Sequence, residues 1–445
     1  MEVVGVIDRN GLRERLLAPS RPLPHIDSVR SNGSWIHRTD GSRVLDGSSG
    51  LVCANVGHSS ARVAERVRRQ LERGAFAGPA TQWPDLQLEL LERLCAAVNR
   101  PEDSVALTTS GTSGIEMAIA LARIAARAQS GGSRHQVLTS SLSYHGNSAF
   151  TLALSGHRRR RPDPADAFGV EPSFPAPYPG FHLCEYGHSC DEVCADVVAE
   201  AIDARGAENV AAVLLEPVNG TTGGAFVPPE GYLKRVAKHC RDRGVILVHD
   251  EVLTGLWRAG RPLASDHWEG AAPDICVLSK GLGAGYTSVG AVMVSPRVAA
   301  MIEGPRGRPL PMMGTMAATP LQAAVCLGVL DELNMLGPEH VAQGGIDLGG
   351  RLRDACPLGP VVRDIRGLGY FYGIEVQDGT LWTQLARLER QGVLLYPFTG
   401  YRPDGTGEGM IVAPPLTSTE DDIEHLISTL RTVLESASVR ESSAS

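Results

Sequence analysis

Apolar segments that alternate with helix-like segments occupy the middle of the chain from Val105 onward. The apolar segments include "VAAVLLEP" (residues 210–217) and "VILVHDEV" (residues 245–252), and stretches such as "GIEMAIALARIAARAQ" and "GYLKRVAKHCRDRG" lie before or between them. Strands that are apolar throughout and are separated by helices indicate a parallel or mostly parallel sheet with helices on both faces. The sequence therefore predicts an α/β fold.

The two ends of the chain carry different patterns. With 445 residues, the chain is longer than one ordinary hydrophobic core accommodates, so we expect a large and a smaller domain. Residues 33–50 have the pattern of a β-hairpin around a "TDG" turn. We assign residues 1–60 and 329–436 to a smaller α+β domain and residues 61–328 to the large domain. We expect residues 437–445 to form a disordered tail.

The overall charge argues against some classes of partner. Lysine plus arginine number 42 and aspartate plus glutamate number 50, which gives a net charge of −8. Nucleic acids and anionic membrane surfaces attract basic proteins, so we predict neither as a partner. The basic run "HRRRRPDP" that starts at His157 contains prolines and an acid. We interpret it as a solvated loop in preference to a phosphate or partner site.

Export and membrane signals are not evident. The first residues lack a basic segment followed by a long apolar one, and no stretch reaches the roughly 20 apolar residues that a membrane span needs. The nine cysteines are odd in number and scattered along the chain. This usage favours reduced thiols, and we expect a cytoplasmic location.

Residues 182–194, "HLCEYGHSCDEVC", contain three cysteines and two histidines. The cysteines do not form a CxxC pair, and no second pair follows at the spacing of a zinc finger. Cys190 and Cys194 stand at the start of a stretch with helical apolar periodicity. We therefore favour a loop that leads into a helix, and we predict no metal site.

Two polar residues, Asp250 and Lys280, follow neighbouring apolar strands of the predicted sheet. Open α/β sheets bind their ligands at the carboxyl ends of the strands. A lysine there suits Schiff-base chemistry because burial readily lowers its pKa. An aspartate that faces a heteroaromatic nitrogen keeps that nitrogen protonated. The pair suggests pyridoxal phosphate, and the alternative is a salt bridge at the edge of the sheet.

A phosphate site is predicted at "TTSGTSGIEMA". Ser110, Gly111, Thr112 and Ser113 lie between a strand and a helix. Backbone N–H groups at a helix N-terminus attract anions, and hydroxyl groups add donors. Small residues are common in such turns, so this signal gains weight only beside the others.

Three further groups follow strands in the same way. "SYHGNS" places Tyr144 and His145 after one strand, and "LLEPVNG" places Glu216 at the end of another. The Tyr144 ring could stack on a pyridine. Because all of these residues stand at the carboxyl ends of strands, one site could gather them.

In these segments the chain resembles the class III aminotransferases, which are pyridoxal-phosphate enzymes of fold type I. The matching segments extend over roughly residues 30–435, and the most specific is the block "HDEVLTG…R…SKGLGAGY"; the others are "TSGTSGIEMAIALAR", "YHG", "EPVNGTTGG", "GYLKRVAKHCRDRG" and "VAPPLTSTEDDIEHL". Within the family, the chain is similar to the ω-aminotransferases, whose members often accept amines that lack an α-carboxylate.

The resemblance implies roles around the cofactor. Lys280 would carry the cofactor as a Schiff base and move a proton between substrate and cofactor. Asp250 would bind the pyridine nitrogen. Tyr144 and Val252 would cover the two faces of the ring. Glu216 would lie near the cofactor's 3′ oxygen or the substrate.

The phosphate contacts implied by the resemblance involve two subunits. Gly111 and Thr112 would hold the phosphate, and Ser110 and His145 belong with them to the expected cofactor-binding residues. Thr315, in "GTMAATP", would reach the phosphate of the neighbouring subunit. The resemblance thus implies a homodimer with shared active sites.

The chain departs from the family pattern at several positions. Ser113 stands where the family's phosphate turn usually has glutamate. Val52 stands where a tryptophan often walls the substrate pocket, so we expect a wider pocket. Ile411 stands where many relatives have an arginine for an α-carboxylate. Arg402 is a possible mobile replacement, and the alternative is an exposed loop arginine.

The predicted function is transfer of an amino group from an amine or amino acid to a keto acid, aldehyde or ketone. A racemase, epimerase, aminomutase or decarboxylase on the same scaffold would share Lys280 and Asp250, so these reactions stay open. A non-catalytic relative that acts as a binding protein is disfavoured, because it would have no need of a Schiff-base lysine.

Overall fold

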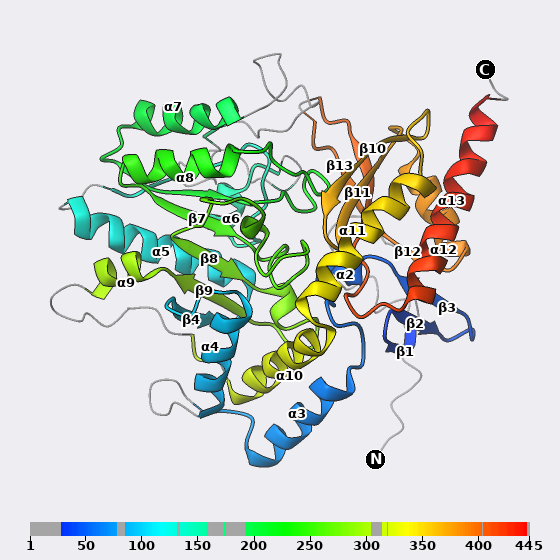
Figure 1. Cartoon of the computed structure of the whole chain (residues 1–445), viewed down its shortest axis with the longest axis horizontal. Helices are drawn as coiled ribbons and strands as arrows, with labels where there is room; N and C mark the ends of the chain where they lie inside the picture. The colour runs from blue at the N-terminus through cyan, green and yellow to red at the C-terminus, as the bar shows by residue number, and fades with distance from the viewer. Residues whose placement is uncertain are drawn as a thin grey trace, which may run out of the picture.

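The computed structural model describes residues 28–77, 85–130, 134–157, 160, 173–174, 192–303, 314–317, 319–402 and 404–442. A large α/β part contains the central sheet, and a smaller part built from both ends of the chain lies beside it (Figure 1). The predicted α/β class is confirmed.

The central sheet has six strands in the described part of the chain. In spatial order they are β4 (Ser104–Thr108), β9 (Gly290–Val294), β8 (Ile275–Leu278), β7 (Ile246–Asp250), β6 (Val210–Leu215) and β5 (Gln136–Thr139). β5 to β8 pair in parallel, and β9 is antiparallel to both of its neighbours. Every residue of β6, β7, β8 and β9 is buried, which explains their uniformly apolar sequences.

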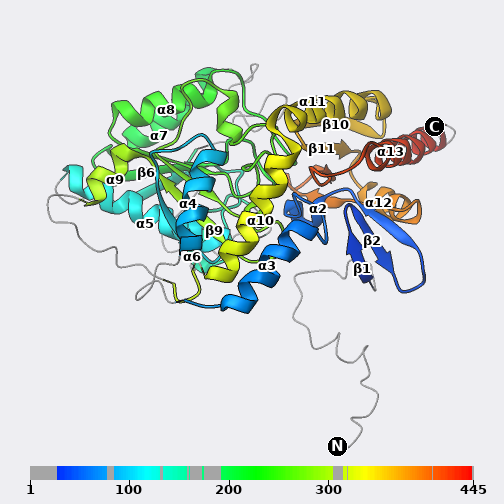
Figure 2. The same ribbon diagram turned by 60° about the horizontal axis from the view of Figure 1, so that its bottom comes forward.

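Helices cover both faces of this sheet (Figure 2). One face packs against α5 (Gly111–Ser130) and α9 (Pro296–Glu303). The other packs against α7 (Asp196–Arg205) and α8 (Tyr232–Asp242). Alternate residues of one strand supply the two cores: Leu214 belongs to the first and Val213 to the second. The remaining helices of this part are α3 (Ala61–Arg73), α4 (Asp85–Ala97), α6 (Ala149–Leu154) and α10 (Pro320–Leu336), with short turns η2 (Glu192–Ala195), η3 (Ala264–His267) and η4 (Lys280–Leu282).

The smaller part contains two four-stranded sheets. One has the order β1 (Ser28–Asn32), β2 (Trp35–Arg38), β3 (Arg43–Asp46), β12 (Val393–Leu394), and the other has the order β10 (Val362–Leu368), β11 (Phe371–Val376), β14 (Glu408–Val412), β13 (Tyr396–Thr399). The helices are α2 (Ser49–Val52), α11 (Pro338–Ala355), α12 (Leu381–Arg390) and α13 (Glu420–Ser442). Because β12 pairs with β3, the two ends of the chain share one sheet.

Several expectations can be compared with these elements. The predicted hairpin is confirmed, since β2 and β3 pair antiparallel around the "TDG" turn. The expected boundary at residues 328 and 329 falls inside α10, which runs without a break from Pro320 to Leu336. α13 continues to Ser442, although the sequence suggested a disordered tail from residue 437.

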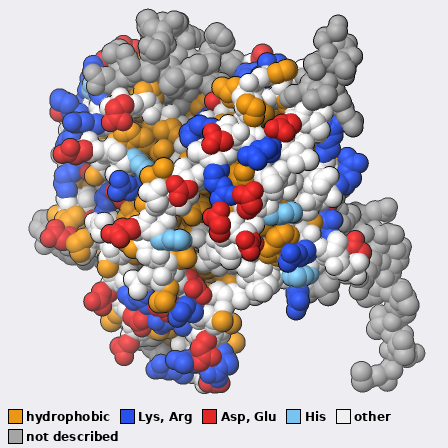
Figure 3. Space-filling view, turned by 45° about the vertical axis from the view of Figure 1, so that its right-hand side comes forward, with side chains coloured by type: hydrophobic (Ala, Val, Ile, Leu, Met, Phe, Trp, Pro, Cys, Tyr) orange, Lys and Arg blue, Asp and Glu red, His pale blue; other side chains and the backbone are white. Residues whose placement is uncertain are grey.

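Other expectations concern the cysteine-rich stretch, membrane spans and the charge of the surface. Of residues 182–194, only the end of the stretch lies within the described residues, and Cys194 is half-buried in η2. None of the described helices combines the length and apolar character that crossing a bilayer requires. On the face shown in Figure 3, acidic and basic side chains are interspersed.

Candidate active site

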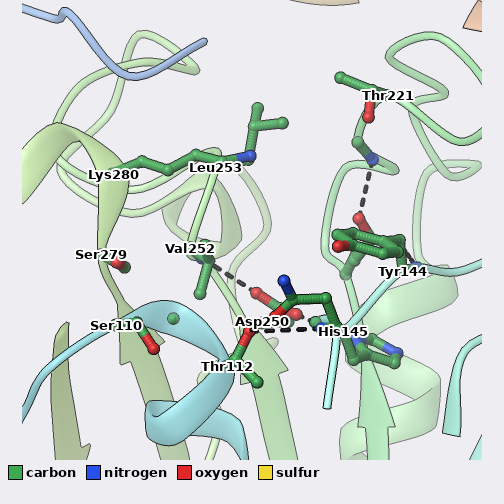
Figure 4. A pocket seen from close by; sticks show the side chains of 15 residues that line it. Ser110, Thr112, Tyr144, His145, Thr221, Asp250, Val252, Leu253, Ser279 and Lys280 are labelled. Atoms are coloured by element: carbon green, nitrogen blue, oxygen red, sulfur yellow. Dashed lines mark hydrogen bonds and ion pairs between the residues drawn. The ribbon is translucent and has the colours of Figure 1, made fainter. Parts of the chain in front are cut away.

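A cavity of about 230 Å³ lies at the carboxyl ends of β4, β7 and β8 (Figure 4). Five separate segments line it, and the lining residues are Ser110, Gly111, Thr112, Tyr144, His145, Gly146, Asn147, Glu216, Gly220, Thr221, Asp250, Val252, Leu253, Ser279 and Lys280. Nine of the twelve residues predicted for the site are among them. The strand ends have gathered these side chains as expected for an open α/β sheet.

Asp250, the last residue of β7, is held in a fixed orientation. Its Oδ2 lies 2.8 Å from Nδ1 of His145, and its Oδ1 accepts a hydrogen bond from the backbone N of Val252 at 3.1 Å. Figure 4 shows both contacts converging on the carboxylate. His145 is buried, and its Nε2 has no partner among the described residues. The histidine thus acts as a support for the carboxylate.

Lys280 follows β8 after one residue, Ser279, and begins η4. Its φ is 28°, a backbone conformation that residues with side chains rarely adopt and that is typical of functional sites. Within the described residues, its Nζ makes no hydrogen bond or ion pair. Burial lowers the pKa of Lys280, although the charges of Asp250 and Glu216 partly oppose this effect. A lower pKa increases the share of neutral amine, which is the nucleophilic form.

The start of α5 forms a cradle for an anion. Gly111 and Thr112 open this helix of 20 residues and line the cavity, so the first backbone N–H groups of the helix, which have no partner within the helix, lie at the cavity. A Cβ on Gly111 would lie 2.8 Å from Cγ1 of Val252, so this close approach requires glycine. The Thr112 hydroxyl donates to Oδ1 of Asn147 at 3.1 Å, which ties the cradle to the loop of Tyr144.

Glu216 is enclosed by hydrogen-bond donors. Its Oε1 accepts from the backbone N of Gly220 at 3.0 Å, and its Oε2 accepts from Nδ2 of Asn219 at 3.0 Å and from the backbone N of Tyr144 at 3.3 Å. Burial raises the pKa of Glu216 from 4.5 to about 7. At neutral pH this carboxyl group can therefore either donate or accept a proton.

Comparison with known proteins decides the family. The model of the family "Aminotransferase class-III" matches residues 17–434. The Bacillus subtilis protein described as the uncharacterised aminotransferase YodT is 32% identical over 420 residues, covering 89% of this chain and 92% of that protein. The chain belongs to the class III aminotransferases.

Other relatives agree with this assignment. An omega-aminotransferase of Caulobacter vibrioides is 27% identical, with 91% of this chain and 92% of that protein covered. The crystal structure of an amine transaminase from an uncultivated Pseudomonas species, in a pyridoxal-phosphate-bound form, matches with a TM-score of 0.84 and 29% identity over 94% of this chain and 98% of that one. The protein is thus an aminotransferase of fold type I, and its cofactor is pyridoxal phosphate.

The residues of the cavity fit this cofactor. The turn at Gly111, which packs closely against Val252, puts the start of α5 and its backbone N–H groups at the cavity, where a phosphate can bind. The oriented carboxylate of Asp250 suits a protonated pyridine nitrogen. The amine of Lys280, which has no partner among the residues that the structure describes, would be available for the cofactor's aldehyde.

Three of the predicted residues lie outside the cavity lining. Val52 is fully buried in the core, with a positive φ of 56°. Thr315 is exposed in the turn 314–317. Arg402 contacts the carboxylate of Glu375, and its Nη1 lies 3.4 Å from Oδ2 of Asp378. This aminotransferase therefore presents none of the three to the cavity of its own chain.

Other lining residues were missed by sequence reasoning. They are neighbours of predicted residues, namely Gly146, Asn147, Gly220, Thr221, Leu253 and Ser279. The polar "HGNS" and "NGTT" stretches were the signal that could have identified some of them. The contact between His145 and Asp250 had no such signal, because 105 positions separate the two residues.

Proposed function

We propose that this aminotransferase takes an amino group from an amine or ω-amino acid and gives it to a keto acid, with Lys280 as the catalytic lysine. The observation that carries the proposal is the amine of Lys280, which has no partner within the described residues and lies in the same cavity as the supported carboxylate of Asp250.

Bound pyridoxal phosphate supplies an aldehyde for the amino group and a ring that takes up electrons from the substrate carbon. Lys280 would hold the cofactor, and its amine would move a proton at the substrate carbon. The lowered pKa of Lys280 suits this role as a base.

The other lining residues would bind and orient the cofactor. Asp250, backed by His145, keeps the proton on the ring nitrogen. Ser110, Gly111 and Thr112 bind the phosphate at the start of α5. Tyr144 and Val252 confine the ring between them. Glu216 lies beside Tyr144 and exchanges a proton with the ring's oxygen or the substrate, for which its pKa of about 7 is suited.

The preference for amines rests on two positions. Ile411 is fully buried in β14, so that position offers no cation for an α-carboxylate. Arg402 would have to leave Glu375 and Asp378 before it could serve as one. The names of two relatives, an omega-aminotransferase and an amine transaminase, support the same preference.

We further propose a cytoplasmic homodimer in which Thr315 reaches the phosphate of the neighbouring subunit. Thr315 is exposed and does not line the cavity of its own chain, which leaves its hydroxyl available to a second copy. The odd number of cysteines supports the location. A protein that sediments only as a monomer and is fully active would contradict the shared site.

The sequence offers a direct test of the lysine. The chain has three lysines, Lys234, Lys238 and Lys280, and the first two lie on α8. Borohydride reduction should fix the cofactor on one lysine, and peptide mapping should find it only on Lys280. Label on Lys234 or Lys238 alone would contradict the assignment.

A donor screen tests the reaction. Amines, ω-amino acids and α-amino acids are each supplied with pyruvate, and the amino product and the carbonyl product are both quantified. Equal amounts of the two products support transamination. A product that keeps its nitrogen, or that has lost carbon dioxide, would identify a racemase, an aminomutase or a decarboxylase instead.

A further inference from the structure

Arg160 lies beside the active-site cavity and belongs to no interaction described so far. Its guanidinium carbon is 5.0 Å from the centroid of the Tyr144 ring, and its Nη2 is 3.5 Å from the hydroxyl of Tyr396 on β13. Tyr144 lines the cavity, whereas Tyr396 belongs to the smaller part of the chain. Arg160 therefore spans the space between the cavity and the β13 strand.

No carboxylate of the described residues neutralises the charge of Arg160. The side chain is exposed. Its charge reaches the cavity, since Arg160 contributes to lowering the pKa of Lys280. An arginine with one weak contact retains most of its five donors for a ligand.

The other arginines near this region are committed. Arg402 contacts Glu375 and Asp378, and Arg366 pairs with Asp364 and Glu375 while donating to the backbone of the 223–224 turn. A carboxylate that approached either of them would compete with existing carboxylates. At Arg160 it would meet no competing carboxylate from the part of the chain that the structure describes.

We propose that Arg160 binds the carboxylate of the keto-acid acceptor, an inference that rests on the proposed transamination. The planar guanidinium can give a carboxylate two parallel hydrogen bonds. The Tyr144 ring beside the guanidinium helps to hold it in place. An amine donor without a carboxylate makes no use of this cation, so one cavity accepts both a neutral and an anionic substrate.

The test uses two acceptors that differ in the carboxylate. Pyruvate and propanal are supplied to the holoenzyme with the same amine donor, and kcat and KM are measured for the wild type, Arg160→Gln, Arg160→Lys and Arg402→Gln. For Arg160→Gln, kcat/KM for pyruvate should fall about 10- to 100-fold, mainly through KM, while the value for propanal stays within about threefold. Arg160→Lys should recover part of the loss because it keeps the charge.

A binding measurement separates recognition from turnover. Propionate has the carboxylate but no oxo group, and its binding to the holoenzyme can be followed by calorimetry. The Kd of Arg160→Gln should be at least about tenfold weaker than that of the wild type. The exposed Arg205, at the end of α7, provides the control variant Arg205→Gln, which should bind like the wild type.

Three results would overturn the inference. Equal losses with pyruvate and propanal would mean that Arg160 only holds Tyr144 in place. Unchanged propionate binding would exclude a carboxylate contact. A selective loss for pyruvate in Arg402→Gln, with none in Arg160→Gln, would move the site to Arg402. If the wild type transferred nitrogen to neither acceptor, the proposed function itself would fail.

Discussion

Two desolvated cations in this protein, Lys280 and Arg258, have opposite surroundings. Arg258 is fully buried and its donors are matched by neutral acceptors: Oδ1 of Asn55 at 2.8 Å, the backbone O of Tyr370 at 3.1 Å, the backbone O of Pro414 at 2.6 Å and Oγ of Ser49 at 3.1 Å. Lys280 is half-buried near two carboxylates, yet its Nζ bonds to none of the described residues.

The difference separates a structural cation from a chemical one. Arg258 lies in the loop after β7, and its hydrogen bonds reach Ser49 and Asn55 after β3 and the backbone of Tyr370 and Pro414 in the smaller part of the chain. This side chain therefore connects the two parts. Burial lowers the pKa of Arg258 to about 10, and the group stays charged at neutral pH. Lys280 is partly removed from solvent and receives no acceptor from the described residues, which favours the neutral amine.

The largest expected effect is the loss of activity in Lys280→Ala. Without the amine there is neither an attachment point for the cofactor nor a base at the substrate carbon, so we expect kcat to fall by more than about 10⁴-fold. The unfolding midpoint of the cofactor-free protein should hardly change, because Nζ makes no bond within the described residues. Steady-state kinetics and thermal unfolding measure the two quantities.

Lys238→Ala provides the control for this change. Lys238 is exposed, pairs with Asp242 on α8 and does not line the cavity. Its replacement should leave kcat unchanged. Substantial transamination by Lys280→Ala would remove Lys280 from the reaction and end the contrast with Arg258.

Asp250→Asn should have the next largest effect. The amide cannot keep the ring nitrogen protonated, so we expect kcat to fall about 10³-fold while the cofactor remains bound. Absorbance of the purified protein reports the cofactor, and initial rates report the loss. Asp203→Asn, at a surface pair with Arg243, is the matched control. An unchanged rate in Asp250→Asn would show that the carboxylate only supports His145.

Arg258→Met tests the structural side of the comparison. The change leaves several buried acceptors without a donor, so the free energy of unfolding should fall by about 3 to 4 kcal/mol. The exposed Arg205→Met should change it by less than about 0.5 kcal/mol. Denaturant titration measures both. A stable Arg258→Met variant with lost activity would place Arg258 with Lys280 instead.

Much of the site could be predicted because its residues follow strands. The apolar sequences of β7 and β8 fix them as buried neighbours, and their parallel pairing sets Asp250 opposite Val277, three positions before Lys280. A local pattern was therefore sufficient to bring the lysine and the aspartate to one edge of the sheet.

The long-range contacts could not be predicted in this way. Asn55 lies 203 positions from Arg258, and Pro414 lies 156 positions from it, so no periodicity relates them. Val52 shows the same limit: the resemblance suggested a place at the pocket wall, whereas its side chain is fully buried in a segment where Ser49, Gly50 and Val52 have positive φ. Such backbone conformations depend on the packed neighbours and not on the local sequence.

The smallest expected effect concerns Glu216, the carboxyl group that shares the cavity with Lys280. Its pKa in the folded protein is about 7, against an ordinary value of 4.5, so the folded state retains a proton that the unfolded chain loses first. The contribution of this proton to stability is complete below pH 4.5 and is lost as the pH rises to about 7. The free energy of unfolding of the cofactor-free protein should therefore lose about 2 to 3 kcal/mol across this range from Glu216 alone. Glu216→Gln stays neutral throughout, so the difference between wild type and variant should shrink or change sign by that amount as the pH rises, as measured by denaturant titration at several pH values. Parallel curves for the two proteins would mean that Glu216 has the same pKa in the folded and the unfolded protein. The cavity would then leave the charge of Glu216 solvated, in contrast to that of Lys280.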